Sequence, residues 1–101
     1  MQMYIQHIQV DGFEWDSGNF DKCQQHGVSV EEIETLFSLP HVIAPDVVHS
    51  IDEERYFVIG RTLSERALLV VFTTRTDVDQ VLVRPISARY MHAKEFKRYE
   101  R

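Results

Sequence analysis

The chain has 101 residues, of which 44% are hydrophobic and 27% are charged, and its formal net charge at pH 7 is −5. The length suits one domain, and the composition lacks the low hydrophobicity that keeps a chain disordered. The longest apolar run, residues 67–72, is far shorter than the roughly 20 residues that span a bilayer. We therefore expect a single cytoplasmic domain over residues 1–101 and no contact with a membrane.

The charges are divided unevenly along the chain. Residues 1–54 contain eleven Asp and Glu but only one basic residue, Lys22, whereas residues 55–101 contain ten Lys and Arg against five acids. A folded acidic protein can still present a basic face that attracts phosphate. The second half of the chain is therefore where we expect a surface for nucleic acid.

The first part of the chain indicates a short strand followed by a helix. Residues 4–10 alternate weakly between apolar and polar side chains, as in a strand. A helix is expected to begin after Asp16 or Ser17, either of which is a good N-cap, and to stop at Gly27. The only cysteine, Cys23, falls inside this helix, so no internal disulfide is possible.

A second helix is indicated from Ser29 onward. Ser29 and Glu32 match the capping-box pattern, in which each side chain accepts a hydrogen bond from a backbone amide at the helix start. Pro40 marks where this helix must have ended. The apolar residues of this segment have the three- and four-residue spacings of one buried helical face: Ile33, Leu36 and Phe37.

The second half of the chain indicates a β-meander and a final helix. Three segments rich in β-branched residues, 55–61, 67–75 and 80–88, are separated by connections short enough for hairpins, so antiparallel pairing is favoured. Residues 91–99 have the spacing of a short amphipathic helix. The predicted class is α+β.

Four segments of the chain resemble the BrnT family: FEWDSGNFDKCQQHGVSVEEIETLF at 13–37, IGRT at 59–62, VVFTTR at 70–75 and RPISARYMHAKE at 84–95. Members of that family are ribonuclease toxins of type II toxin–antitoxin modules, related in fold to the RelE and ParE toxins. The resemblance implies two N-terminal helices packed on a twisted antiparallel sheet of three to four strands, with a short C-terminal helix.

The resemblance also implies an activity and a partner. The activity is RNA cleavage that inhibits translation, and the partner is a BrnA-like ribbon-helix-helix antitoxin, through which alone the complex binds operator DNA. Asn19 and Gln25 stand where many members have basic residues. We therefore expect the sheet, more than the first helix, to contact RNA.

Cleavage of RNA without a metal ion requires a base for the 2′-hydroxyl, cations for the charge on the phosphate and an acid for the leaving oxygen. Arginine suits the cationic role, because its planar guanidinium binds phosphate with paired hydrogen bonds. Four arginines lie at or near predicted strand ends and are expected to converge on one rim: Arg61, Arg75, Arg84 and Arg89. Arg61, Arg75 and Arg89 are the candidate catalytic cations. The alternative is that they are solvated strand ends paired with acids such as Asp77, Asp79 or Glu65.

Arg84 shares strand parity with Leu82 and Ile86, which would point it inward unless Pro85 introduces a bulge. It is interpreted either as a structural ion pair or as an RNA contact.

His26 is the candidate group for proton transfer, although an imidazole at a helix C-terminus is also a common cap. Tyr90, His92 and Lys94 are the further candidate RNA contacts, with exposure on the last helix as the alternative for His92. The roles of general acid and base stay open, because Tyr90, Tyr99 or Glu54 could also serve.

No histidine or acid spacing matches a metal site and no glycine-rich phosphate loop occurs, so we predict neither metal nor cofactor. The acids at residues 52–54 are interpreted as a loop. The alternative to a ribonuclease is a catalytically inactive family member that acts as a protein-binding module with an antitoxin-like partner.

Overall fold

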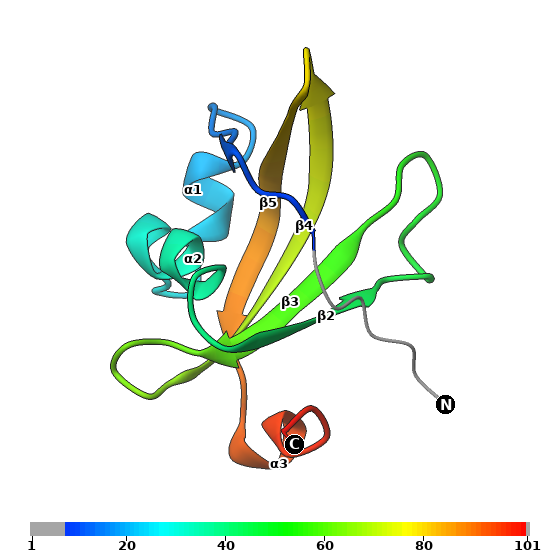
Figure 1. Ribbon diagram of the computed structural model, residues 1–101. Coiled ribbons are helices and arrows are strands. Elements are labelled where there is room, and N and C mark those ends of the chain that lie inside the picture. The colour runs from blue at the N-terminus through cyan, green and yellow to red at the C-terminus, as the bar shows by residue number, and fades with distance from the viewer. Residues whose placement is uncertain (1–7, 101) are drawn as a thin grey trace.

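The computed structural model describes residues 8–100, in which a five-stranded sheet is flanked by three short helices (Figure 1). The strands are ordered β1-β5-β4-β3-β2 across the sheet. Their bounds are β1 Gly12–Phe13, β2 His41–Pro45, β3 Tyr56–Arg61, β4 Ala67–Asp77 and β5 Gln80–Tyr90. The helices are α1 Phe20–Cys23, α2 Val30–Leu36 and α3 Ala93–Phe96.

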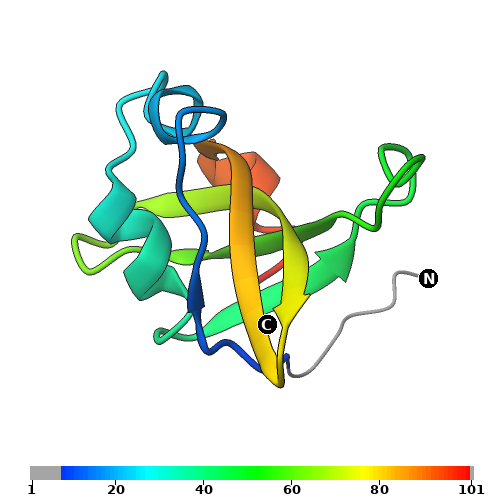
Figure 2. The same ribbon diagram turned by 90° about the horizontal axis from the view of Figure 1, so that it is seen from above.

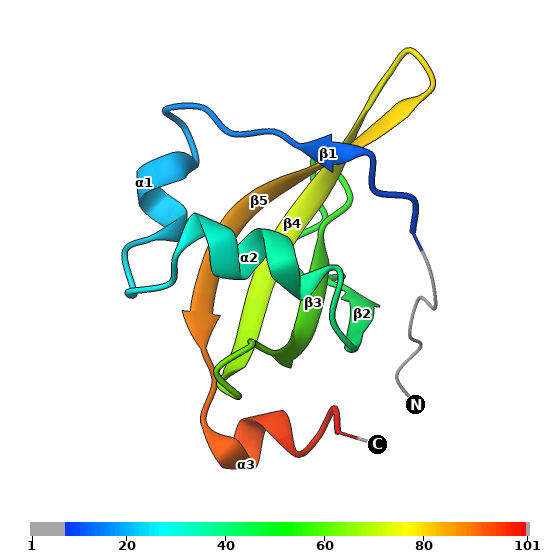
Figure 3. The ribbon, with the colours of Figure 1, turned by 60° about the vertical axis from the view of Figure 1, so that its left-hand side comes forward.

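The predicted fold class, two N-terminal helices on an antiparallel sheet of three to four strands, is wrong. The fold is mostly β, and its sheet is mixed because β1 runs parallel to β5 while the other pairs are antiparallel (Figure 3). The expected relation in fold to the RelE and ParE toxins stays a prediction. The sequence analysis also missed β2, a five-residue edge strand that ends at a proline.

The expected first helix is reduced to the single turn of α1, because the residues before it form a turn of their own. The Asp16 carboxylate accepts the Gly18 amide hydrogen at 2.7 Å, and Asn19, the actual N-cap residue, accepts the Asp16 amide hydrogen at 2.9 Å. Asn19 is buried and donates to the carbonyls of Glu14 and Pro85. This asparagine therefore connects the turn to β5. The strand expected over residues 4–10 lies largely outside the described residues, and residues 8–10 form no strand.

The second helix begins as predicted. Ser29 is the N-cap of α2, and both hydrogen bonds of the capping box to Glu32 are present. Ile33 and Leu36 are fully buried, which contributes roughly 1.5–3 kcal/mol each. α2 ends at Leu36, four residues before Pro40.

The antiparallel pairing of the three predicted segments is confirmed as β3, β4 and β5. Their alternating side chains build two separate cores. The core on one face includes Val58, Val70 and Phe72 with the buried side chains of α2. The core on the other face includes Ile59 and Leu69 with Met91 and Phe96 near and in α3. The sheet is therefore covered by α1 and α2 on one face and by α3 on part of the other.

A bulge in β5 decides where Arg84 points. Val71 pairs with Ser87 and Phe72 with Pro85, so Ile86 has no partner on β4. The buried Pro85 pairs with Phe72 and shares its face with α2, and Arg84 therefore lies on the opposite face of the sheet. The bulge beside Pro85, which the sequence analysis gave as the condition for Arg84 to point away from the core, is therefore present.

Candidate functional site

The four predicted arginines share the sheet face opposite α1 and α2. Register places Arg61 beside Ala67, Arg89 beside Leu69, Arg84 beside Thr73, and Arg75 beside Leu82. They form two groups: Arg61 and Arg89 lie near α3, and Arg75 and Arg84 lie toward the β4–β5 hairpin. Four strand positions separate Leu69 from Thr73, which is roughly 13 Å at 3.3 Å per residue. The four side chains therefore do not converge on one rim.

The two arginines near α3 pair with acids that follow β5. Arg89 donates to both carboxylate oxygens of Glu95, at 2.9 and 2.6 Å. Arg61 pairs with Glu100 at 3.2 Å and lies 4.5 Å from the centre of the Phe96 ring. The hydrogen bonds to Glu95 raise the pKa of Arg89, and the same contact lowers the pKa of Glu95. Both guanidinium groups stay nearly half exposed.

The two arginines toward the hairpin share a group of acids. Arg84 donates to Asp16 at 2.9 and 3.1 Å and to Glu14 at 3.1 Å, whereas Arg75 donates to Glu53 at 2.7 Å. The Arg84 hydrogen bond is the main reason why the pKa of Asp16 is lowered. The Arg84 side chain is 18% exposed against 41% for Arg75, so Arg75 is the more accessible of the two.

His26 and Tyr90 lie on the side of α1 and α2. His26 is exposed in the turn that follows α1. The Tyr90 hydroxyl donates to Glu32 at 2.7 Å, and the Arg66 guanidinium lies 3.4 Å from the centre of the Tyr90 ring. Tyr90 therefore already has partners for its hydroxyl and for one face of its ring.

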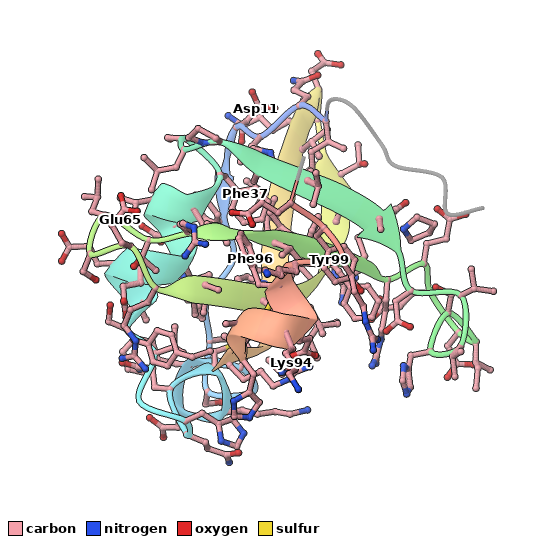
Figure 4. The ribbon with its side chains drawn as sticks, turned by 90° about the horizontal axis from the view of Figure 1, so that it is seen from below. Asp11, Phe37, Glu65, Lys94, Phe96 and Tyr99 are labelled. Atoms are coloured by element: carbon pink, nitrogen blue, oxygen red, sulfur yellow. The ribbon has the colours of Figure 1, made fainter. Side chains whose placement is uncertain are left out.

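His92 and Lys94 lie at the start of α3. His92 is the N-cap residue, but its side chain makes no capping hydrogen bond. Both side chains are exposed, and Figure 4 shows Lys94 and Phe96 on α3, with Tyr99 in the turn that follows. These two candidates thus lie on the segment that also carries Glu95, the partner of Arg89.

A cluster that the sequence analysis missed lies in residues 46–55, the loop that projects from the sheet between β2 and β3 (Figure 2). The two oxygens of the buried Asp46 carboxylate lie within hydrogen-bond distance of Nδ1 of His49, Oδ2 at 2.9 Å and Oδ1 at 3.1 Å. The Ser50 hydroxyl donates to the Asp46 carbonyl at 2.7 Å and accepts the Arg55 amide hydrogen at 2.9 Å. The loop is thereby held in one conformation beside the start of β3.

Arg55 completes this cluster. Its Nε is buried, and within residues 8–100 it has no hydrogen-bond partner. A cavity of about 260 Å³ is lined by five residues of the loop: His49, Ile51, Asp52, Glu53 and Arg55. The signal in the sequence was the three-residue spacing of Asp46 and His49, which fits a turn in which one side chain holds the other.

Fold and site together define a small β-rich domain that carries several guanidinium groups on one sheet face, the groups that proteins use to bind phosphate. A family model described as "Ribonuclease toxin, BrnT, of type II toxin-antitoxin system" matches residues 15–95, which include β2 to β5. The chain belongs to this BrnT family, as its resemblance indicated, and membership implies an antitoxin partner. No curated protein matches the chain. Within residues 8–100, no helix is long and apolar enough to cross a bilayer.

Proposed function

We propose that this chain is the toxin of a type II toxin–antitoxin module and that it inhibits translation as a metal-independent endoribonuclease. The observation that carries the proposal is the shared sheet face of Arg61, Arg75, Arg84 and Arg89 in a chain of the BrnT family. Guanidinium groups supply the fixed positive charge that a pentacoordinate phosphate requires, and this role needs no metal ion.

In this proposal Arg61, Arg75 and Arg89 bind different phosphates along the RNA, because they are too far apart to hold one phosphate. His26, on the side of α1 and α2, is the sequence-based candidate for proton transfer. RNA must first displace the carboxylate partners of the arginines. This displacement is feasible because exposed ion pairs contribute only about 0–1 kcal/mol. Each guanidinium can bind a phosphate of RNA through two parallel hydrogen bonds, as Arg89 binds the Glu95 carboxylate in this structure.

The proposed RNA contacts beyond these groups are Arg84, Tyr90, His92 and Lys94. The exposed positions of His92 and Lys94 support their part in this set. Tyr90 is the least suited member, because its hydroxyl and one ring face already have protein partners.

The proposed partner is a BrnA-like ribbon-helix-helix antitoxin that neutralises the toxin and carries the complex to operator DNA. Direct DNA binding by this chain is disfavoured by its net charge of −5. In the described part of the chain the three helices have four, seven and four residues, too short to read a major groove in the manner of a recognition helix.

Induced expression in bacteria tests the proposal. We expect growth arrest with RNA cleavage, relieved by co-expression of the neighbouring antitoxin gene. Arg89→Ala should weaken RNA binding and thereby lower cleavage, because it removes one cation from the RNA-binding face. Unchanged cleavage by a folded Arg89→Ala protein would remove this residue from the site.

A second candidate function is an inactive binding module that pairs with an antitoxin-like protein. It is favoured by one observation: all four face arginines are already paired with carboxylates. Normal growth at high expression, together with retained antitoxin binding, would support this module against the nuclease.

A further inference from the structure

We propose that His49, held by Asp46, is the general base of RNA cleavage and that Arg55 and Arg75 bind the scissile phosphate beside it. This assignment rests on the proposed ribonuclease function and adds a site in the loop between β2 and β3. It assigns proton abstraction to His49 instead of His26.

The Asp46 carboxylate determines which nitrogen of the His49 ring can accept a proton. Both oxygens of the Asp46 carboxylate lie within 3.1 Å of Nδ1 of His49, and the Asp46 side chain is only 5% exposed. A carboxylate at Nδ1 holds the ring hydrogen on that nitrogen and leaves Nε2 free to accept a proton. The His49 side chain is 65% exposed, so a substrate can reach this ring.

Hydrogen bonds hold the loop between β2 and β3 in place. The Asp46 amide donates to the Arg55 carbonyl at 2.8 Å, and Ser50 connects the Asp46 carbonyl to the Arg55 amide. The Thr73 hydroxyl in β4 donates to the Glu54 carbonyl at 2.7 Å. These hydrogen bonds hold histidine, aspartate and arginine together in the loop and join its base to β4, so the site does not depend on a loop closing over RNA.

Arg55 supplies the first cation of the proposed site. Arg55 lines the same cavity as His49, and its buried Nε donor is unsatisfied within residues 8–100. A buried donor that lacks an acceptor is unfavourable, so a turn of the Arg55 guanidinium toward an anion in the cavity would relieve this cost. The cavity holds about 260 Å³, several times the roughly 30 Å³ that one water occupies in the liquid, so a phosphate group fits.

Arg75 can supply a second cation to the same site. Its guanidinium donates to Glu53 at 2.7 Å, and Glu53 lines the cavity. A phosphate that displaces Glu53 would gain Arg75 as a second cation. The ionisable groups around His49 are then Asp46, Asp52, Glu53 and Arg55. Asp52 and Glu53 repel a phosphate at the entrance, so binding requires the exposed Arg75–Glu53 pair to open, and such pairs are weak.

The proposed step conserves atoms and charge. Nε2 of His49 takes the proton of a ribose 2′-hydroxyl, and the 2′-oxygen forms a bond to phosphorus. The bond between phosphorus and the 5′-oxygen breaks, and the 5′-oxygen takes a proton from water. The products are a 2′,3′-cyclic phosphate and a 5′-hydroxyl, and the imidazolium returns its proton to solvent.

The test uses the full-length protein and a labelled single-stranded RNA of mixed sequence, with cleavage rates measured from pH 5 to 8. We expect His49→Ala to lower the rate by about 10²–10⁴-fold and to remove the acidic limb of the pH profile. Val48→Ala is the matched control, because Val48 is the exposed neighbour of His49 in the same loop and should cleave at the wild-type rate. Thermal midpoints of all variants verify folding.

Variants of Asp46 and Arg55 test whether these residues act in catalysis and RNA binding or only stabilise the fold. Asp46→Asn should lower the rate and shift the acidic limb, whereas a purely structural aspartate would change stability and leave the limb in place. Arg55→Ala should weaken RNA binding, and Arg55→Lys should restore it in part. An RNA with a 2′-deoxy nucleotide at the cleavage position should not be cut.

The outcomes are distinguishable. If the wild type cleaves RNA and folded His49→Ala cleaves equally fast, or keeps the acidic limb with the same midpoint, the base lies elsewhere and this assignment is overturned while the ribonuclease stands. Cleavage of the 2′-deoxy substrate overturns it as well. If the folded wild type cleaves no RNA, the proposed function fails, and the role of His49 fails with it.

Discussion

Tyr90 donates its hydroxyl hydrogen to Glu32, the residue that closes the capping box of α2, with Tyr90 Oη and Glu32 Oε1 2.7 Å apart. The same oxygen accepts the Ser29 amide hydrogen at 3.1 Å. Burial opposes ionisation of Glu32, but the hydrogen bonds from Tyr90 and Ser29 outweigh it, so the pKa of this carboxyl is lowered. One carboxylate thus joins the end of β5 to the start of α2.

Glu32→Ala should therefore lower the free energy of unfolding by about 1–2 kcal/mol, because it removes the carboxylate half of the capping box and the Tyr90 contact together. Tyr90→Phe removes only the contact and should lower it by about 0.5–1.5 kcal/mol. Urea denaturation measures both, and the double variant should lose less than the sum. A wild-type unfolding midpoint for Glu32→Ala would contradict this account.

The pair of Asp16 and Arg84 predicts a pH-dependent stability. The Arg84 hydrogen bond lowers the pKa of Asp16 in the folded state below its unfolded value of about 3.9. The resulting stabilisation is present above that unfolded value and is lost as pH falls through the folded value. Asp16→Asn should therefore unfold at lower urea than the wild type at pH 7, with the difference shrinking at acid pH.

A control for that comparison is Asp79→Asn in the β4–β5 hairpin. Asp79 is exposed with a φ of 66°, a conformation that asparagine tolerates well, so this change should leave stability nearly unaltered at both pH values. A difference between Asp16→Asn and the wild type that stays constant from pH 7 to acid would show that the Arg84 pair is not its cause.

Cys23 should be inert in the folded protein. Its side chain is fully buried, and burial raises the pKa of its thiol to about 11. Because the thiolate is the reactive form, a colorimetric thiol reagent at pH 8 should titrate no cysteine in the native protein and one in urea. Rapid reaction under native conditions would indicate that the core around α1 is open.

Gly60 in β3 is predicted to tolerate no side chain. A Cβ atom there would lie 2.7 Å from the Pro40 carbonyl oxygen and 3.0 Å from Cδ1 of Leu36. Gly60→Ala should lower the free energy of unfolding by about 1–3 kcal/mol, because the backbone between α2 and β2 must move. Gly12→Ala is the matched comparison, since its Cβ would meet only the end of the Leu82 side chain at 3.2 Å, and it should cost less.

The parts of the fold that were predictable from the sequence depend on neighbouring residues. The capping box of Ser29 and Glu32 and the two hairpins are specified by short spacings, and all of them are present. The parallel pairing of Gly12 with Leu82 joins residues 70 positions apart, and no local pattern predicts it. The first helix failed for a related reason, because Asp16 and Asn19 form contacts with β5 instead of extending a helix.

The candidate site divides in the same way. The chemistry of arginine predicted the candidate phosphate-binding residues. Their carboxylate partners were not predictable, because they come from distant segments, such as Glu53 for Arg75. Within residues 8–100 the buried Nε donor of Arg55 has no hydrogen-bond partner, and the strand pattern alone did not distinguish this arginine from a strand end. His49 matches no metal-site spacing, and apart from the three-residue spacing to Asp46 nothing in the sequence indicates their contact, which forms in the folded loop.

RNA cleavage by the purified protein in the presence of EDTA tests the central claim most directly. The wild type should cut labelled single-stranded RNA, Arg75→Ala should cut it at least about 10²-fold more slowly, and Asp79→Asn should match the wild type. A folded wild-type protein that binds its antitoxin but leaves the RNA intact would contradict the account and favour the binding module.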